Sequence, residues 1–271
     1  KYIDAYGFIV LRVGGATILF WLVSFLGPKE KIAKSDFLRI AACAFFGVAF
    51  NMLTFFKGLS YTSPIMGAVL MVTTPMIVLI LSSIIMKERM QSKKVIGILL
   101  GLAGTITLIL YGKALNNAPN ATLGNLLVFV NAVSYGFYLI FVKKLMDRYN
   151  AFTFVKYIYL FGFFMVLPFG FNELQVVNWN EIPLDISLKI GFVVIFSTFF
   201  TYLLNLISMR NLKPTTVAVF IYLQPFFATI FAIGLGKDNL NLVKIISATL
   251  IFVGVYLVIH KKKEVNIPSE H

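Results

Sequence analysis

Polar side chains that could bind a small molecule recur at helical spacing within long apolar runs. Two sets follow the spacing i, i+3, i+4 and i+7, namely Thr198, Thr201, Tyr202 and Asn205, and Asn131, Ser134, Tyr135 and Tyr138. This spacing places each set on one face of a helix. Amides and hydroxyls gain little by facing hydrocarbon, so both faces are expected inside a helix bundle. There they either bind a substrate or hold helices together.

Two prolines lie near the middle of apolar runs. Pro75 and Pro225 each remove one helix hydrogen bond and free a carbonyl group. A freed carbonyl is tolerated at that depth where the backbone is buried in protein or lines a water-filled cavity. We therefore expect a kink or hinge at both prolines, beside a cavity, and the alternative is a kink that serves packing alone.

These two signals together predict the lining of a central cavity. Thr74 and Gln224 immediately precede the prolines, and Asn51 occupies the position equivalent to Thr201 in the other half of the chain. The predicted lining is Asn51, Thr74, Tyr135, Tyr138, Thr201, Tyr202, Asn205, Tyr222 and Gln224. Such a site offers hydrogen bonds and aromatic surface without a carboxylate, which suits neutral, zwitterionic or apolar-tailed molecules better than strong cations.

Residues for catalysis or metal binding are scarce. The lone cysteine, Cys43, lies in an apolar run, and the two histidines, His260 and His271, are near the chain end, so neither a disulfide nor a Cys/His metal site is expected. The sequence contains no HExxH or GxSxG motif. None of its 11 acidic residues lies in the middle of an apolar run. We expect no catalytic residue, no metal and no cofactor.

The elements that must position these residues are membrane-spanning helices. Apolar residues make up 59% of the 271 positions and charged residues 13%, against about 25% charged in soluble domains. Crossing a bilayer takes about 20 apolar residues in a helix. Nine runs reach that scale, at 5–26, 37–56, 64–86, 95–111, 123–142, 152–171, 186–209, 214–235 and 242–259. Apolar and polar residues do not alternate in them, so the fold class predicted is an all-α integral membrane protein.

Basic residues orient the helices. The net charge of +13 comes from bases clustered in every second connection, near positions 29–34, 87–94, 143–148, 210–213 and 261–263. That pattern is typical of membrane orientation rather than of nucleic-acid binding. It predicts a multi-pass protein of the plasma or bacterial inner membrane, with the C-terminus in the cytoplasm and Lys1 on the opposite side.

The sequence repeats itself after 150 residues. Without a gap, this shift superimposes Pro64 on Pro214, Pro75 on Pro225 and Gly104 on Gly254. The run at 123–142 then falls upstream of residue 1, so we expect a missing first helix and ten spans in two inverted groups of five. The predicted domains are a first repeat at 1–112, an external linker at 113–122, a second repeat at 123–263 and a cytoplasmic tail at 264–271.

Residues 66–110 and 215–259 resemble the end of an EamA domain of the drug/metabolite transporter superfamily. The features that carry the resemblance are a mid-membrane proline, an acidic residue in a short loop (Glu88, Asp238) and a helix that contains glycine (Gly97, Gly101, Gly104, Gly254). The glycines are expected to pack helices, and the acids to form salt bridges or caps. Arg12, Lys156 and Lys189 lie within spans and either snorkel or bind ligand. The resemblance implies that Arg12 meets an anionic or zwitterionic substrate.

The resulting hypothesis is a transporter that exports or exchanges small polar or amphipathic metabolites, amino acids among them, by alternating access. The alternatives are an intramembrane enzyme and a non-transporting membrane scaffold protein, and a channel is disfavoured because no charged ring or filter loop occurs. The expected partners are a small-molecule substrate and membrane lipid, without nucleic acid, and the chain is expected to act as a monomer or homodimer. Because no acidic residue lies in the middle of a span, three explanations stay open for proton coupling. It is lost, its acidic residue lies on the missing helix, or the protein is a facilitator that needs no coupling.

Overall fold

The computed structural model describes residues 2–111, 120–236 and 239–260. Lys1, Asp238, residues 113–119 of the predicted linker and the predicted tail at 264–271 lie outside the described residues.

Within the described ranges, nine helical spans are long and apolar enough to cross a membrane. The spans are α1 (Ala5–Ser24), α2 to α3 (Asp36–Tyr61), α4 to α5 (Pro64–Ile85), α6 (Ser92–Leu110), α7 (Ala121–Met146), α8 (Ala151–Gln175), α9 to α10 (Leu184–Ser208), α11 to α12 (Pro214–Gly234) and α13 (Leu242–Ile259). This confirms the nine predicted runs. Several helices extend a few residues beyond their apolar runs, because polar residues continue a helix where it leaves the hydrocarbon.

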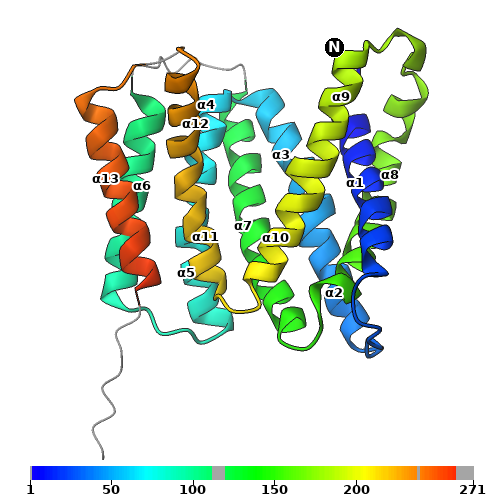
Figure 1. The fold of residues 1–271 in the computed structure, drawn as a ribbon, viewed down its shortest axis with the longest axis horizontal. Helices are drawn as coiled ribbons and strands as arrows, with labels where there is room; N and C mark the ends of the chain where they lie inside the picture. The colour runs from blue at the N-terminus through cyan, green and yellow to red at the C-terminus, as the bar shows by residue number, and fades with distance from the viewer. Residues whose placement is uncertain (1, 112–119, 237–238, 261–271) are drawn as a thin grey trace, which may run out of the picture.

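The connections gather at the two ends of the bundle. Those that follow α1, α5, α7 and α10 lie at the lower edge of Figure 1, and those that follow α3 and α8 lie at the upper edge. The lower connections carry the clustered bases, for example Lys29, Arg89, Arg148 and Lys213. We call this end the basic face. The helices between the two ends expose large apolar side chains to the outside, such as Ile84 and Leu188, as expected for surfaces that contact lipid.

Two spans contain a π-helical segment at equivalent places. A π-helical segment, η1 (Phe45–Ala49), joins α2 (Asp36–Ala44) to α3 (Phe50–Tyr61), and another, η3 (Val193–Phe200), joins α9 (Leu184–Phe192) to α10 (Thr201–Ser208). The two segments overlap under the 150-residue shift. π-Helical turns of this kind are frequent at functional sites.

The helices that carry the two prolines are broken. α4 (Pro64–Met71) ends before α5 (Thr74–Ile85) begins, and Pro75 lies in the first turn of α5. In the second half, the 3-10 turn η4 (Phe220–Tyr222) separates α11 (Pro214–Val219) from α12 (Leu223–Gly234), just before Pro225. The missing amide hydrogens of the prolines account for these interruptions.

Glycines bring α6 and α13 into close contact. A β-carbon at Gly97 would lie 2.6 Å from the carbonyl oxygen of Gly254, and one at Gly104 would lie 2.7 Å from that of Ser247. Gly101 faces the ring of Tyr222. The predicted packing role of this glycine ridge therefore agrees with the contacts observed.

We expect Gly97→Leu to destabilise the protein, because backbone atoms of α13 occupy the space that the new side chain needs. The free energy of unfolding should fall by about 1–3 kcal/mol or more. Gly191→Leu is the matched control, since a β-carbon at Gly191 would meet nothing within 4 Å. Thermal unfolding in detergent measures both, and equal midpoints for the two variants would contradict the tight contact.

Candidate substrate-binding site

A hollow of about 240 Å³ lies between helices of the two halves of the chain. Its wall is formed by α1, α3, α4, α7, α10, η4 and α12. The lining residues are Arg12, Asn51, Met52, Phe55, Phe56, Met71, Asn131, Tyr135, Thr201, Tyr202, Asn205, Ile221 and Gln224. Five of these thirteen residues have apolar side chains, and the other eight carry amide, hydroxyl or guanidinium groups. We call it the central hollow.

Seven of the ten residues that the sequence singled out for binding line the central hollow. They are Arg12, Asn51, Tyr135, Thr201, Tyr202, Asn205 and Gln224. The tyrosine and threonine sets converge because the polar faces of α7 and α10 both turn toward the centre of the bundle. Their role in binding stays a prediction.

Three of the ten lie outside the lining. Thr74 is fully buried, and its hydroxyl donates to the carbonyl oxygen of Met71 at 2.6 Å. Tyr138 is buried against Gly47, behind the rings of Tyr135 and Tyr202. Tyr222 packs on Gly101 in the core beside α6. A position next to a proline, or on a polar helix face, was therefore not enough to predict where these three side chains point.

The proline breaks face the central hollow. Met71 and Ile221 each lie four residues before a proline, and both line the hollow. Because proline has no amide hydrogen, the carbonyl group four residues earlier loses its usual partner. The Thr74 hydroxyl supplies a substitute for Met71. At both prolines, the residue whose carbonyl group loses its partner therefore lines the central hollow, next to which the prolines were expected.

Arg12 contributes the one charge among the lining residues. Its Nε donates to the Thr198 hydroxyl at 3.1 Å, and its guanidinium carbon lies 5.9 Å and 5.8 Å from the ring centres of Phe8 and Phe56. Among the described residues no carboxylate pairs with it. A guanidinium within a span is costly unless it is paired or hydrated. Its remaining N–H groups are thus available to an anionic group in the hollow.

The amide side chains divide into two kinds. Asn51 and Asn131 are engaged with each other's helix, because Asn51 Nδ2 donates to the Asn131 carbonyl oxygen at 3.2 Å and Asn131 Nδ2 donates to that of Asn51 at 2.7 Å. These bonds join α3 to α7. Asn205 and Gln224, in contrast, make no side-chain hydrogen bond to any part of the chain that the structure describes. Both the donors and the acceptors of these two side chains are therefore left for a ligand.

The hydroxyls near the hollow stabilise the π-helical segments. Tyr202 donates to the carbonyl oxygen of Gly47 in η1 at 3.0 Å. Thr198 and Thr201 donate to carbonyl oxygens five residues earlier, at 3.0 Å and 2.9 Å. The wider π-helical turn leaves these carbonyls accessible to side chains.

A second hollow of about 310 Å³ adjoins the central one. The two share Phe55, Met71, Ile221 and Gln224, and the second reaches Pro64. Pro64 begins α4 at the end of the bundle opposite the basic face (Figure 1). The two adjoining hollows therefore lie between the middle of the bundle and that end.

On the basic face, Glu88 joins two connections. Its side chain is only 5% exposed and pairs with Lys94, and it also lies 3.6 Å from Lys213 Nζ and accepts from the Thr215 hydroxyl at 3.2 Å. Lys213 and Thr215 flank the start of α11, in the other half of the chain. We call these contacts the Glu88 clip. The salt bridge expected for Glu88 from the sequence is therefore observed.

The sequence matches the EamA-like transporter family over residues 1–110 and 122–260. The chain belongs to the EamA-like transporter family. It is therefore a membrane transporter of the drug/metabolite transporter superfamily rather than an enzyme, as predicted from the lack of catalytic motifs. The family assignment also makes it a multi-pass integral membrane protein.

Its relatives carry names that give no substrate. An uncharacterized transporter of Archaeoglobus fulgidus is 26% identical over 97% of this chain and 91% of its own length. The uncharacterized transporter YetK of Bacillus subtilis is 25% identical over 86% of this chain and 71% of its own length. A crystal structure of a protein that is 16% identical superimposes with a TM-score of 0.78, over 96% of this chain and 88% of that one. That likeness shows a shared fold alone.

Sequence reasoning missed the apolar part of the wall. Met52, Phe55, Phe56, Met71 and Ile221 line the central hollow, but an apolar residue in a membrane helix is equally suited to lipid or to another helix. No signal in the sequence separates these cases. Asn131 was on a predicted polar face, and its spacing could have placed it in the lining.

Proposed function

We propose that this EamA transporter exports or exchanges small polar or amphipathic metabolites, amino acids among them. The observation that carries the proposal is the chemistry of the central hollow. Arg12 faces it without a carboxylate partner among the described residues, and the amides of Asn205 and Gln224 are unengaged there. A guanidinium suits a carboxylate, the amides suit a polar head, and Phe55, Phe56 and Met52 suit an apolar tail.

The transport cycle in this proposal is alternating access between two inverted repeats. Pro64 begins α4 at the end opposite the basic face, whereas Pro214, its partner under the 150-residue shift, begins α11 on the basic face (Figure 1). That opposite sense supports an inverted relation. The adjoining hollows extend away from the basic face while the Glu88 clip spans it, which is the arrangement of a state closed on that face.

The lining of the central hollow contains Arg12 but no acidic residue, so none of its side chains could carry a proton on a carboxylate. We propose exchange or facilitated flux driven by the substrate gradient, and coupling through an acid outside this lining is the alternative.

Counterflow into proteoliposomes tests the proposed function. Vesicles that contain the full chain are loaded with one unlabelled amino acid or small carboxylate at a time, and uptake of the same labelled compound is followed. We expect accumulation for compounds that combine a carboxylate with an apolar or aromatic tail. Absence of counterflow across the panel, with folded and inserted protein, would contradict this substrate class.

We also propose that the basic face is cytoplasmic, from the distribution of bases. Single cysteines at Lys93 and Lys143, in a background without Cys43, should be labelled from the same, cytoplasmic side by a membrane-impermeant maleimide. Labelling of the two positions from opposite sides would contradict this topology.

A further inference from the structure

A separate hollow of about 620 Å³ lies on the basic face, away from the central hollow. It is formed by the end of α1, the connection at 25–35 and the first turns of α8 (Ala151–Gln175). Residues that matter for its chemistry are Lys29, Glu30, Lys31, Lys156, Ser24 and Tyr157. We call it the peripheral hollow. It contains three ammonium groups and one carboxylate.

The one acidic residue of this connection, Glu30, is directed toward the protein. Glu30 Oε2 accepts from the Asn150 amide at 2.8 Å and from the Thr153 hydroxyl at 2.7 Å. These bonds fix the middle of the connection to the start of α8. The one carboxylate in the wall is therefore already engaged with hydrogen-bond donors of the protein.

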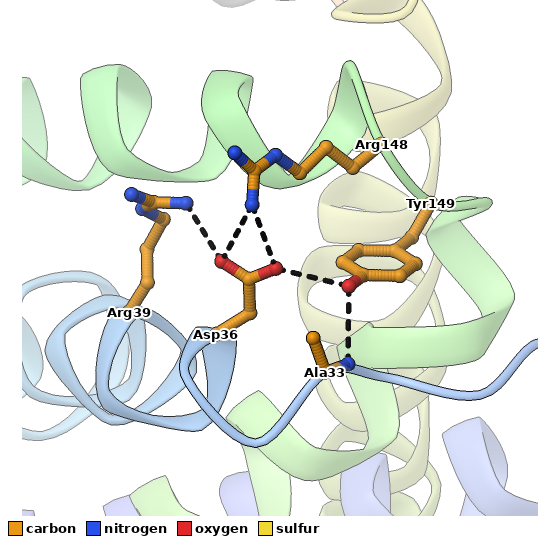
Figure 2. Close-up of polar contacts among 5 residues, drawn as sticks. All are labelled: Ala33, Asp36, Arg39, Arg148 and Tyr149. Atoms are coloured by element: carbon orange, nitrogen blue, oxygen red, sulfur yellow. Dashed lines mark hydrogen bonds and ion pairs between the residues drawn. The ribbon is translucent and has the colours of Figure 1, made fainter.

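Asp36 fixes the end of the same connection. Its side chain is 3% exposed and accepts from Arg39 at 2.8 Å, from Arg148 at 3.1 Å and from the Tyr149 hydroxyl at 2.9 Å. The Tyr149 hydroxyl in turn accepts from the Ala33 amide at 3.1 Å. Figure 2 shows how these groups converge on the Asp36 carboxylate from α2 and from the turn between α7 and α8. The connection is thus held in place by contacts to both carboxylates, of which that of Asp36 is paired with cations.

The lysines of the peripheral hollow are not paired with a carboxylate of any residue that the structure describes. Lys29, Lys31 and Lys156 form no ion pair with any residue in the described ranges. Lys156 Nζ lies 3.3 Å from the Ser24 hydroxyl and 4.8 Å and 5.4 Å from the ring centres of Trp21 and Tyr157. The hollow is therefore a positively charged concavity with a positioned ammonium group in its wall.

The surroundings of the peripheral hollow are those of a membrane boundary. Trp21 and Tyr157 are of the residue types that gather at the level of lipid head groups. Beside them Leu22, Phe25 and Leu26 are 58%, 79% and 84% exposed, which provides apolar surface for acyl chains. A ligand bound here needs an anionic group that faces the lysines, and its other end lies next to membrane lipid.

We propose that the peripheral hollow binds the phosphate of an anionic phospholipid head group, such as phosphatidylglycerol, through Lys29, Lys31 and Lys156. Basic pockets between membrane helices on the cytoplasmic side are suited to such head groups. The three lysines surround the phosphate while the acyl chains lie along the exposed residues at the end of α1. This site is independent of the substrate, so a failed transport assay leaves its test unaffected.

Tryptophan fluorescence provides the test, because one of only two tryptophans lies at the site. Trp179, on η2 (Trp179–Glu181) beyond the far end of α8, is replaced by phenylalanine, which leaves Trp21 as the reporter. The full chain is reconstituted in phosphatidylcholine vesicles that contain brominated phosphatidylglycerol or brominated phosphatidylcholine. We expect brominated phosphatidylglycerol to quench Trp21 with at least about tenfold higher apparent affinity, since each of the three lysines near an anionic lipid contributes roughly fivefold.

Variants separate a defined site from general attraction to the basic face. Lys29→Gln/Lys31→Gln, at two exposed positions, should lower the preference at least about fivefold. Lys34→Gln is the matched control, because Lys34 lies in the same connection but outside the wall of the hollow, and it should keep the preference. An equal loss in both would show diffuse attraction and overturn the proposal.

Two further outcomes would also overturn it. One is equal quenching by the two brominated lipids. The other is loss of the preference when inorganic phosphate is added at constant ionic strength, because the hollow would then take a free anion rather than a lipid. Unchanged fluorescence of each variant in vesicles without bromine controls for folding around Trp21.

Discussion

Replacing Arg12 by glutamine is expected to reduce transport of carboxylate-bearing substrates by roughly 10- to 100-fold. Glutamine keeps a donor toward the hollow but removes the charge. Charge-assisted hydrogen bonds contribute about 1.5–3 kcal/mol, which corresponds to that change in affinity. The loss should appear in KM more than in the maximal rate, because the anchor is removed and the rest of the hollow is unchanged. Counterflow in proteoliposomes measures both values.

The control for Arg12→Gln is Lys189→Gln. Lys189 also lies within a span, but it is 70% exposed and paired with Asp185 at 2.9 Å, away from the central hollow. Its replacement should leave transport unchanged. A second comparison uses the substrate, since the neutral amide of the same compound should lose little affinity in Arg12→Gln. Equal losses for the acid and its amide would show that Arg12 acts on the fold rather than on the carboxylate.

Breaking the Glu88 clip is expected to shift the transporter toward a state open on the basic face. Glu88→Gln removes the ion pairs with Lys94 and Lys213 while keeping the size of the side chain. These contacts stabilise only the state closed on the basic face. If that state loses about 1.5–3 kcal/mol of stability, the ratio of the open to the closed state rises by roughly 10- to 100-fold. The variant should therefore exchange substrate at an altered rate and expose the central hollow to the basic face.

Cysteine labelling measures this shift. In a Cys43→Ala background, Asn205→Cys reports access to the central hollow by a membrane-impermeant maleimide applied from the basic face. Labelling should rise at least tenfold in Glu88→Gln. Asp147→Asn is the matched control, because the Asp147 carboxylate is 53% exposed and pairs with Lys143 of its own helix. Labelling of Glu88→Gln at the rate of the parent would show that the clip does not hold that face closed.

The sequence was informative wherever a single physical constraint decides the outcome. A membrane leaves the backbone no partner but itself, so each long apolar run had to be a helix, and nine such spans lie within the part of the chain that the structure describes. Glycine at spacings of three and four residues allows close helix contact, and α6 meets α13 through Gly97 and Gly254.

Side-chain direction near the prolines could not be predicted. Thr74 precedes Pro75 as Gln224 precedes Pro225, but only Gln224 lines the central hollow. Thr74 instead uses its hydroxyl to satisfy the Met71 carbonyl at the end of α4, which a short side chain can reach three residues earlier in the chain. The longer side chain of Gln224 extends into the space.

The helical spacing assumed for residues 198–205 also gave one wrong side-chain direction, that of Thr198. The spacing of Thr198, Thr201, Tyr202 and Asn205 assumes 3.6 residues per turn, but η3 is π-helical through Phe200. Thr198 is consequently fully buried beneath Arg12, while the other three residues line the hollow. A wider turn cannot be inferred from apolar periodicity, because every position in this run suits the membrane.

The central claim is that the unengaged amides of Asn205 and Gln224 bind substrate in a hollow between the two halves of the chain. Counterflow by Asn205→Ala, Gln224→Ala and the double variant tests it most directly, with Asn211→Ala, an exposed amide in the connection after α10, as control. Each lost hydrogen bond to a polar ligand costs about 1–3 kcal/mol. We predict a loss of at least about fivefold for each single variant and a larger loss for the double variant, with Asn211→Ala unchanged. Normal transport by both single variants at normal expression would contradict the assignment and leave these polar faces as helix contacts alone.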